Sequence, residues 1–360
     1  MPTLAATAVV GPPENANQLN VMLPVTYTPV SAGFGVQPVT ATPSPPAPPL
    51  AATPLATTPT IGPSPTYYAY AGLTIDELRE RPFGGGVLQT HEVMTTGPNF
   101  ARHLISYPSD GLTIYGFINT PPDPGPLPVV LVLHGFVEPD DYTVTAYTTP
   151  YADELAKDGF LVIHPNYRNH PPSDNGDNLF RVGYAVDVLN LISIIRAQAG
   201  QPGPLQNADP SRIYLFGHSM GGGIALRVLT VSPHIRAAAL YGSMSGDEQR
   251  NFEKIALWSN GRSGAEERQA AAADLQRISP GYYLRNITAP LSIHHGTADA
   301  MTPPEWSSQL CEQLQTLGNE VNCYRYPGEP HNFTAAGQRL LMNRVSAFFT
   351  ETGEDVEVSR

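Results

Sequence analysis

The sequence predicts one α/β domain in which a mostly parallel, twisted sheet is covered by helices on both faces. Apolar strand-like runs alternate with helical patterns along the chain, which is typical of parallel strands joined by crossover helices. Several of these runs are continuously apolar, as strands buried on both faces are. About 290 residues follow a proline-rich beginning, and this length suits a single domain at the upper end of the ordinary size range.

The first 66 residues differ in composition from the rest. They contain fifteen of the 38 prolines, many Thr and Ala residues, and Glu14 as their one charged side chain. Dense proline with little apolar bulk favours an extended, polyproline-like chain without a core. We therefore expect residues 1–66 to be a disordered spacer of the kind that separates a secreted domain from an anchor or cell wall. A disordered tail without a function is the alternative.

The domain, residues 67–360, is expected to begin with a helix and antiparallel strands. A Thr-x-x-Glu capping box at Thr74 starts a short helix. Between residues 87 and 118, strand-like runs are separated by turn signals at Gly97-Pro98 and Asp110-Gly111. These runs predict the antiparallel start of the sheet.

Six later apolar runs are the predicted parallel strands, with helical patterns between them. The pattern from Phe180 to Gln198 places Val188, Ile192 and Ile195 at helical spacing, so this helix is expected to face the core. The expected strands are Val129–Leu133, Phe160–His164, Ile213–Phe216, Ala237–Tyr241, Leu291–His295 and Val321–Tyr326.

The most informative motif follows the strand Ile213–Phe216. It reads Gly217-His218-Ser219-Met220-Gly221, and a helical pattern from Ile224 to Val231 comes after it. Glycines on both sides of Ser219 allow the sharp strand-to-helix turn that exposes a nucleophilic serine hydroxyl. A chance glycine-rich turn is the alternative, so the assignment depends on partners elsewhere in the chain.

Two partners of the required kind follow in the sequence. A serine hydroxyl needs an imidazole to take its proton and a carboxylate to hold that imidazole in the right tautomer. Asp299 comes after the run Leu291–His295, and His331 lies in a loop after the run Val321–Tyr326. The order Ser, Asp, His, each just past a strand, predicts that the three residues meet at one edge of the sheet. Asp247, which follows the preceding strand, is the alternative carboxylate.

A tetrahedral intermediate also needs preorganised N–H donors for its oxyanion. The backbone N–H of Met220, directly after the serine, is the first candidate. The second is expected in a loop after an early strand, and Val129–Leu133 is followed by His134-Gly135-Phe136. We assign the backbone N–H of Phe136 to this role. Its ring is either a wall for the substrate or a simple packing element.

From about His103 to Glu351 the chain resembles the α/β-hydrolase superfamily, and most of all the catalytic domain of prolyl-oligopeptidase-type hydrolases and the dienelactone-hydrolase-like esterases. The resemblance implies the α/β-hydrolase fold and an acyl-enzyme reaction with a Ser219-Asp299-His331 triad. Seven blocks in the family's order carry it: Tyr107–Gly116, Leu133–Gly135, Pro165–Arg168, Asp209–Ile213, Gly217–Gly222, His295–Asp299 and Tyr326–Phe333.

The chain departs from the oligopeptidase pattern in two ways. It has neither the length nor the repeats for the β-propeller that gates those enzymes. After His134-Gly135 it has Phe136 where they tend to have further Gly or Pro, and Tyr142 is the nearest phenol. A carboxylic-ester hydrolase is therefore the leading interpretation. The alternatives are a serine peptidase with the same residues and an inactive binding protein on a cell surface.

Two features of the second half of the domain leave alternatives open. Residues 243–287 are polar and rich in Ala and Gln, and in this fold such an insertion often forms a cap. Phe252 and Trp258 within it either line the acyl pocket or pack onto the sheet. Cys311 lies on a helical pattern and Cys323 on the next strand, so a disulfide and two buried thiols are both compatible with the sequence.

Composition argues against several other classes. A net charge of -12 without a Lys/Arg cluster disfavours a nucleic-acid partner, and a small ester or peptide is the expected substrate. No phosphate-binding glycine loop or metal-site spacing is present, so we expect neither cofactor nor metal.

No run of 18 apolar residues predicts a membrane span. No signal-peptide pattern opens the chain, yet the spacer predicts export to the outside or the cell surface, with Met1 in place of a removed leader or anchor signal.

Overall fold

The computed structural model describes residues 70–145, 148–261, 264–265 and 267–354. The chain divides into two units, Met1–Ser64 and Pro65–Arg360. The described residues all belong to the second unit. The predicted spacer at residues 1–66 lies outside the described residues and stays a prediction.

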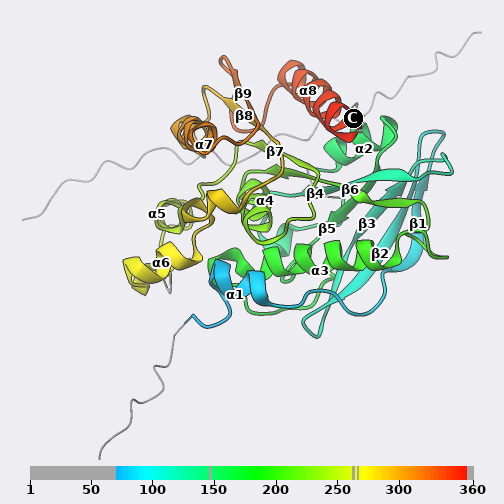
Figure 1. Cartoon of the computed structure of the whole chain (residues 1–360), viewed down its shortest axis with the longest axis horizontal. Helices are drawn as coiled ribbons and strands as arrows, with labels where there is room; N and C mark the ends of the chain where they lie inside the picture. The colour runs from blue at the N-terminus through cyan, green and yellow to red at the C-terminus, as the bar shows by residue number, and fades with distance from the viewer. Residues whose placement is uncertain (1–69, 146–147, 262–263, 266, 355–360) are drawn as a thin grey trace, which may run out of the picture. The chain divides into compact units, whose positions relative to one another are not determined.

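Within the described residues, nine strands form one sheet in the order β1-β2-β3-β5-β4-β6-β7-β8-β9 (Figure 1). The pairs β1–β2, β2–β3 and β3–β5 are antiparallel. The pairs β5–β4, β4–β6, β6–β7, β7–β8 and β8–β9 are parallel. This confirms the predicted mostly parallel sheet with an antiparallel start. The strands are β1 Gln89–Thr96, β2 Ala101–Ser109, β3 Leu112–Thr120, β4 Leu127–Leu133, β5 Leu161–Pro165, β6 Ala208–His218, β7 Ala237–Tyr241, β8 Leu291–Gly296 and β9 Val321–Tyr326.

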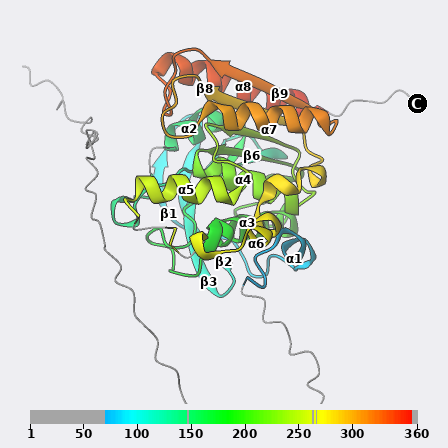
Figure 2. The ribbon, with the colours of Figure 1, turned by 90° about the vertical axis from the view of Figure 1, so that its left-hand side faces the viewer.

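Helices cover both faces of the sheet, as predicted. α2 (Thr149–Lys157) and α8 (Ala335–Gly353) pack on one face, where Tyr151, Leu155 and Phe349 are buried. Apolar residues of the other main helices are buried against the opposite face. Figure 1 shows β8 and β9 between α7 on one side and α8 on the other, and in Figure 2 the α7 side faces the viewer. These other helices are α1 Ile75–Glu80, α3 Val182–Gln198, α4 Met220–Val231, α6 Ala272–Ile278 and α7 Pro304–Thr316.

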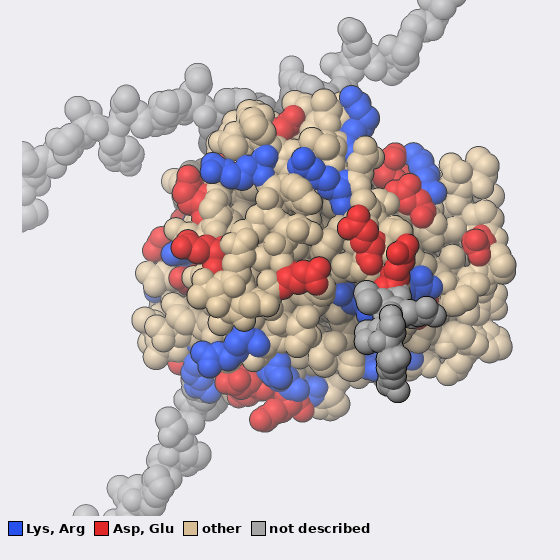
Figure 3. Space-filling model, turned by 45° about the horizontal axis from the view of Figure 1, so that its top comes forward, with Lys and Arg blue, Asp and Glu red and all other residues tan. Residues whose placement is uncertain are grey.

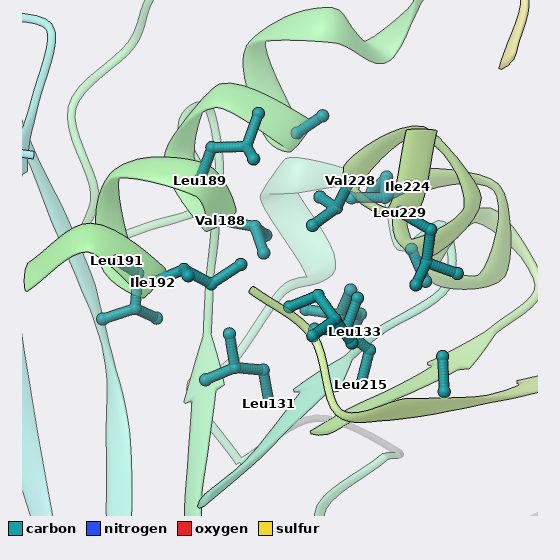
Figure 4. Packing of buried hydrophobic residues seen from close by; sticks show 14 of the residues in the cluster. Leu131, Leu133, Val188, Leu189, Leu191, Ile192, Leu215, Ile224, Val228 and Leu229 are labelled. Carbon is teal, nitrogen blue, oxygen red and sulfur yellow. The ribbon is translucent and has the colours of Figure 1, made fainter. Parts of the chain in front are cut away.

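The centre of the core lies where α3 and α4 meet the middle strands. Figure 4 shows apolar side chains of both helices packed toward β4 and β6. Burial of such side chains contributes about 1.5–3 kcal/mol each relative to leaving them in water. This packing fixes the start of α4, and therefore the residue that precedes it, against the end of β6. The residues in contact include Leu131, Leu133, Val188, Ile192, Leu215, Ile224 and Val228.

The insertion at residues 243–287 contains α5 (Glu248–Trp258) and α6, joined to short 3-10 turns. Glu248 at the start of α5 is buried and forms ion pairs with Arg227 of α4 and with Arg181. Phe252 packs against the core, whereas Trp258 remains 36% exposed. The ion pair between Glu248 and Arg227 joins α5 to α4, the helix that follows Ser219. Whether the insertion acts as a cap stays a prediction.

A disulfide between Cys311 and Cys323 joins α7 to β9. It resolves the alternative that the sequence left open. The chain between the two cysteines carries the end of α7 and the turn into the edge strand.

Among the described helices, none is both long and apolar enough to cross a membrane.

We expect removal of this disulfide to lower stability without changing the reaction. A closed loop with a sequence separation of 12 stabilises a fold by about 2–3 kcal/mol, because it restricts the unfolded chain. The paired Cys311→Ser and Cys323→Ser substitutions should therefore lower Tm by several degrees in a thermal scan, while turnover of a simple ester at 25 °C stays within about twofold. Equal Tm values for the oxidised protein and the double variant would contradict this expectation.

Candidate active site

Ser219 occupies the turn between β6 and α4. Its backbone has φ 55° and ψ -117°, a left-handed conformation that is rare and strained for a residue with a side chain. The serine is partly exposed although the residues on either side of it, His218 and Met220, are buried. The structure therefore presents Ser219 at the carboxyl end of the sheet in the manner of a nucleophile elbow.

Glycines make this turn possible by allowing backbone to approach backbone. A Cβ atom on Gly217 would collide with the carbonyl oxygen of Gly221, and a Cβ on Gly221 would collide with the carbonyl oxygen of Leu133. No side chain can relieve such a clash, because both obstacles are backbone atoms. The glycine spacing seen in the sequence is thus a steric requirement of the turn.

Asp299 and His331 are hydrogen-bonded to each other. His331 Nδ1 lies 2.8 Å from Asp299 Oδ2, so Nδ1 carries the proton and donates it to the carboxylate. Asp299 follows β8 and its side chain is buried; His331 lies in the loop between β9 and α8 and is half-buried. This tautomer leaves Nε2 of His331 as the basic nitrogen of the ring.

Other donors also hold the Asp299 carboxylate. The N–H groups of Met301 and Thr302 donate to Oδ1 at 2.8 and 2.9 Å, and the Thr302 hydroxyl lies 2.9 Å from Oδ2. Burial acts to raise the pKa of Asp299, but hydrogen bonds from His295, His331 and Thr302 outweigh it and hold the pKa well below the usual range. Asp299 is therefore a carboxylate anion near neutral pH.

Sequence reasoning missed Thr302 and His295 as partners of this carboxylate. Thr302 lies three residues after Asp299, and a threonine at that spacing is a common local hydrogen-bond partner of an aspartate. The sequence places His295 only at the end of a strand. Its contact depends on how the loop after β8 folds back, which no local pattern reveals.

Ser219 follows β6, and Tyr241 at the end of the next strand, β7, connects it with the loop of His331. Its N–H donates to the carbonyl oxygen of Tyr241 at 2.9 Å, and the Tyr241 hydroxyl donates to the carbonyl oxygen of His331 at 2.8 Å. The ring of His218 also packs on the ring of His331, with centroids 4.8 Å apart. Among the described residues, Ser219 Oγ makes no hydrogen bond to His331. A serine hydroxyl rotates freely, and catalytic contacts are often long before substrate binds.

The two residues predicted to supply oxyanion donors lie just after β6 and β4. Met220 is the first residue of α4, and the first N–H groups of a helix have no acceptor within the helix. Phe136 follows β4, and Nδ1 of His134 lies 2.7 Å from the carbonyl oxygen of Gly135. Because the C=O and N–H of a trans peptide point in opposite directions, this contact turns the N–H of Phe136 away from His134. The Phe136 side chain is 59% exposed.

The alternative residues have other partners. Asp247 is the N-cap of α5 and accepts a hydrogen bond from the N–H of Gln249 at 3.0 Å. The Tyr142 hydroxyl donates to Asn166 Oδ1 at 2.9 Å, and Tyr142 is buried against the ring of His134. Among the residues that the structure describes, no group of three or more His, Cys, Asp or Glu side chains is arranged to hold a metal ion.

Charged side chains are mixed on the face of the described domain that Figure 3 shows, where groups of Lys and Arg lie next to groups of Asp and Glu. The charged side chains on this face form no extensive patch of one sign.

Comparisons with known proteins agree with the fold. Residues 203–354 match the model of the prolyl oligopeptidase family, and residues 128–262 match the model of the alpha/beta hydrolase fold. A solved structure of an acetyl xylan esterase from Paenibacillus sp. R4 superposes with a TM-score of 0.56 at 16% identity, covering 76% of this chain and 92% of that one. This likeness shows the fold.

Two curated relatives carry different enzyme names. An uncharacterized peptidase of Bacillus subtilis is 26% identical over 299 residues, which are 76% of this chain and 43% of the peptidase. A carboxymethylenebutenolidase-like protein of Synechocystis sp. is 22% identical over 258 residues, 68% of this chain and 90% of the relative. The chain thus spans less than half of the length of the peptidase that it matches.

Proposed function

We propose that this enzyme, a hydrolase with the α/β-hydrolase fold, cleaves carboxylic esters through an acyl-enzyme at Ser219. The observation that carries the proposal is the hydrogen bond from His331 Nδ1 to Asp299 Oδ2, which gives His331 the tautomer of a general base. Ser219 lies on the adjacent elbow, in the strained conformation that nucleophiles of this fold adopt.

The proposed reaction has two halves. His331 Nε2 takes the proton of Ser219 as its oxygen attacks the ester carbonyl, and the N–H groups of Met220 and Phe136 stabilise the oxyanion. The tetrahedral intermediate collapses, His331 returns the proton to the leaving alkoxide, and the alcohol departs. Water then attacks the acyl-enzyme by the same proton transfers, which releases the acid and restores Ser219.

Esters are favoured over peptides by the chemistry of the leaving group. An alcohol leaves with little assistance, whereas an amine leaves only when His331 protonates it efficiently. A peptidase that trims short peptides also needs a site for the charged amino terminus, normally an acidic pair, and the sequence contains no pattern that identifies such a pair. The exposed Phe136 beside the proposed oxyanion hole suits an apolar acyl or aryl group better than a charged one.

A serine peptidase is the second candidate. The match of residues 203–354 to the prolyl oligopeptidase family supports it, because that region contains Ser219, Asp299 and His331. The same three residues would perform the same steps on an amide.

Substrate panels separate the two candidates. We expect short-chain p-nitrophenyl esters to be hydrolysed with kcat/KM at least about tenfold above that of any aminoacyl or dipeptidyl anilide. Ser219→Ala protein prepared in parallel is the control for spontaneous ester hydrolysis. Higher kcat/KM values for alanyl or prolyl anilides would replace the esterase by the peptidase and leave the triad unchanged.

We also propose that the protein works outside the cytoplasm. The disulfide between Cys311 and Cys323 supports this, since such bonds persist mainly in oxidising compartments. The Pro/Thr-rich composition of residues 1–66 supports it independently. Detection of the protein in the culture medium or on intact cells tests the proposal, and its recovery from the cytosol alone would overturn it.

A further inference from the structure

Two histidines contact the same oxygen of Asp299. His295 Nε2 lies 3.1 Å from Asp299 Oδ2, and His331 Nδ1 lies 2.8 Å from that atom. His295 belongs to β8 and is almost fully buried, with 2% of its surface exposed. The carboxylate therefore lies between two imidazole rings, and the proposed mechanism uses only one of them.

The neighbours of His295 fix which of its nitrogens carries the proton. Nε2 faces Asp299 Oδ2 and, at 3.0 Å, the carbonyl oxygen of Thr302, and both oxygens can only accept. Nδ1 lies 2.6 Å from the hydroxyl of Ser307 on α7, which can donate. A neutral ring with its proton on Nε2 satisfies all three contacts. The single Nε2–H of His295 donates to the carbonyl oxygen of Thr302 and is shared with Asp299 Oδ2, so its contact with the carboxylate is weaker than that of His331.

We propose that His295 is a positioning residue for the catalytic carboxylate: its Nε2–H holds Asp299 Oδ2 in place and draws part of its charge away from His331. The inference rests on the proposed function, since it assigns His331 as the base. His295 does not touch the reacting atoms and acts through Asp299.

The charge balance around Asp299 Oδ2 explains the effect. Three groups that can donate lie within 3.1 Å of this oxygen: His331, and His295 and the Thr302 hydroxyl, which share their protons with the carbonyl oxygens of Thr302 and Gly242. If the His295 donor is removed, more of the negative charge faces His331, and the protonated form of the base becomes more favourable. Because a protonated His331 cannot take the proton of Ser219, the loss of activity on acidification would begin at a higher pH. The carboxylate also becomes freer to turn away from His331.

The other groups that the structure describes in contact with His331 carry no charge. Burial, together with the neighbouring His331, lowers the pKa of His218 to about 3, so the ring that packs on His331 is neutral. Burial raises the pKa of Tyr241, whose hydroxyl donates to the carbonyl oxygen of His331. The Thr302 hydroxyl, 3.3 Å from His331 Nδ1, is neutral as well. Asp299 is thus the charge next to the base, and the number of its donors matters.

A matched pair of variants tests the proposal. His295→Leu removes the donor at similar volume, whereas His295→Gln places an amide N–H where Nε2 lay. With p-nitrophenyl acetate as substrate, we expect His295→Leu to lower kcat about tenfold, to leave KM within about twofold, and to move the acid limb of kcat against pH upward by about half a unit. His295→Gln should restore kcat to within about threefold and return the acid limb to its wild-type position.

A proton NMR measurement supplies a readout that needs no substrate. The low-field resonance of the His331 Nδ1 proton reports the Asp299–His331 hydrogen bond, and it should move in His295→Leu but not in His295→Gln. An unmoved resonance with unchanged kcat and acid limb would overturn the proposal. The proposal would also be overturned if both variants had the same lowered Tm while kcat, the acid limb and the resonance stayed unchanged. That result is expected of a histidine with a purely structural role.

Two further arms keep the test decisive. If His295→Leu does not fold, Ser307→Ala takes its place, because it removes the hydroxyl that keeps the His295 proton on Nε2. The acid limb of kcat against pH should then move in the same direction by a smaller amount. An unmoved acid limb in Ser307→Ala would overturn the proposal. Absence of any hydrolysis by the wild-type protein would instead count against the proposed function, and the NMR arm would still test the His295 contact.

Discussion

Replacing Ser219 by alanine is expected to abolish hydrolysis and labelling by a fluorophosphonate while the protein stays folded. The loss in kcat should be on the order of 10⁴-fold or more, because only the oxyanion donors and substrate binding remain once the nucleophile of a triad is removed. The thermal transition should change little. Ser219 already has a strained backbone, and alanine keeps the Cβ atom and removes only a partly exposed hydroxyl.

A second serine on the same helix provides the matched control. Ser232 is the C-cap of α4, at the opposite end of the helix from Ser219. Thirteen residue steps at about 1.5 Å each place it roughly 20 Å away. Ser232→Ala should keep full labelling and turnover. Labelling that survives Ser219→Ala, or that disappears in Ser232→Ala alone, would show that another residue is the nucleophile.

The features of the fold that follow local rules could be predicted from the sequence. The run of apolar residues before Gly217 predicts a buried strand, and the glycines after it predict the turn, because both depend on neighbours in the chain. The capping box at Thr74 is present in α1 for the same reason. The expected strands lie within a few residues of the observed ones. β6 is longer than expected, since it begins at Ala208, where Leu127 of β4 pairs with it.

Features that depend on contacts between distant segments could not be predicted. The sequence suggests a helix from Phe180, but α3 begins at Val182, because Phe180 and Arg181 adopt left-handed conformations. At the site, the sequence predicts one histidine against the carboxylate of Asp299, and the structure has two. The second contact requires the loop after β8 to fold around His295 and reach Ser307 on α7. The block His295–Asp299 contains both residues, but its spacing alone does not show that the two side chains meet.

Replacement of the proposed catalytic carboxylate, Asp299, is the second substitution with a large expected effect. Asp299→Asn is expected to lower kcat by about 10³–10⁴-fold. The N–H groups of Met301 and Thr302 donate to Oδ1, so the amide oxygen of the new side chain takes that place. Its NH₂ group then replaces Oδ2 and faces His331 Nδ1. Since an NH₂ group only donates, Nδ1 must accept, the proton moves to Nε2, and His331 can no longer take the proton of Ser219.

Asp247→Asn is the matched change at the rival carboxylate, and we expect it to leave kcat and Tm nearly unchanged. Asp247 accepts the N–H of Gln249 as the N-cap of α5, and asparagine caps a helix about as well as aspartate does. Initial rates on one ester, measured for both variants together with thermal scans, separate the two assignments. A large loss in Asp247→Asn with normal turnover in Asp299→Asn would transfer the triad to Asp247. Equal, small effects in both would mean that His331 is oriented by its surroundings without a carboxylate.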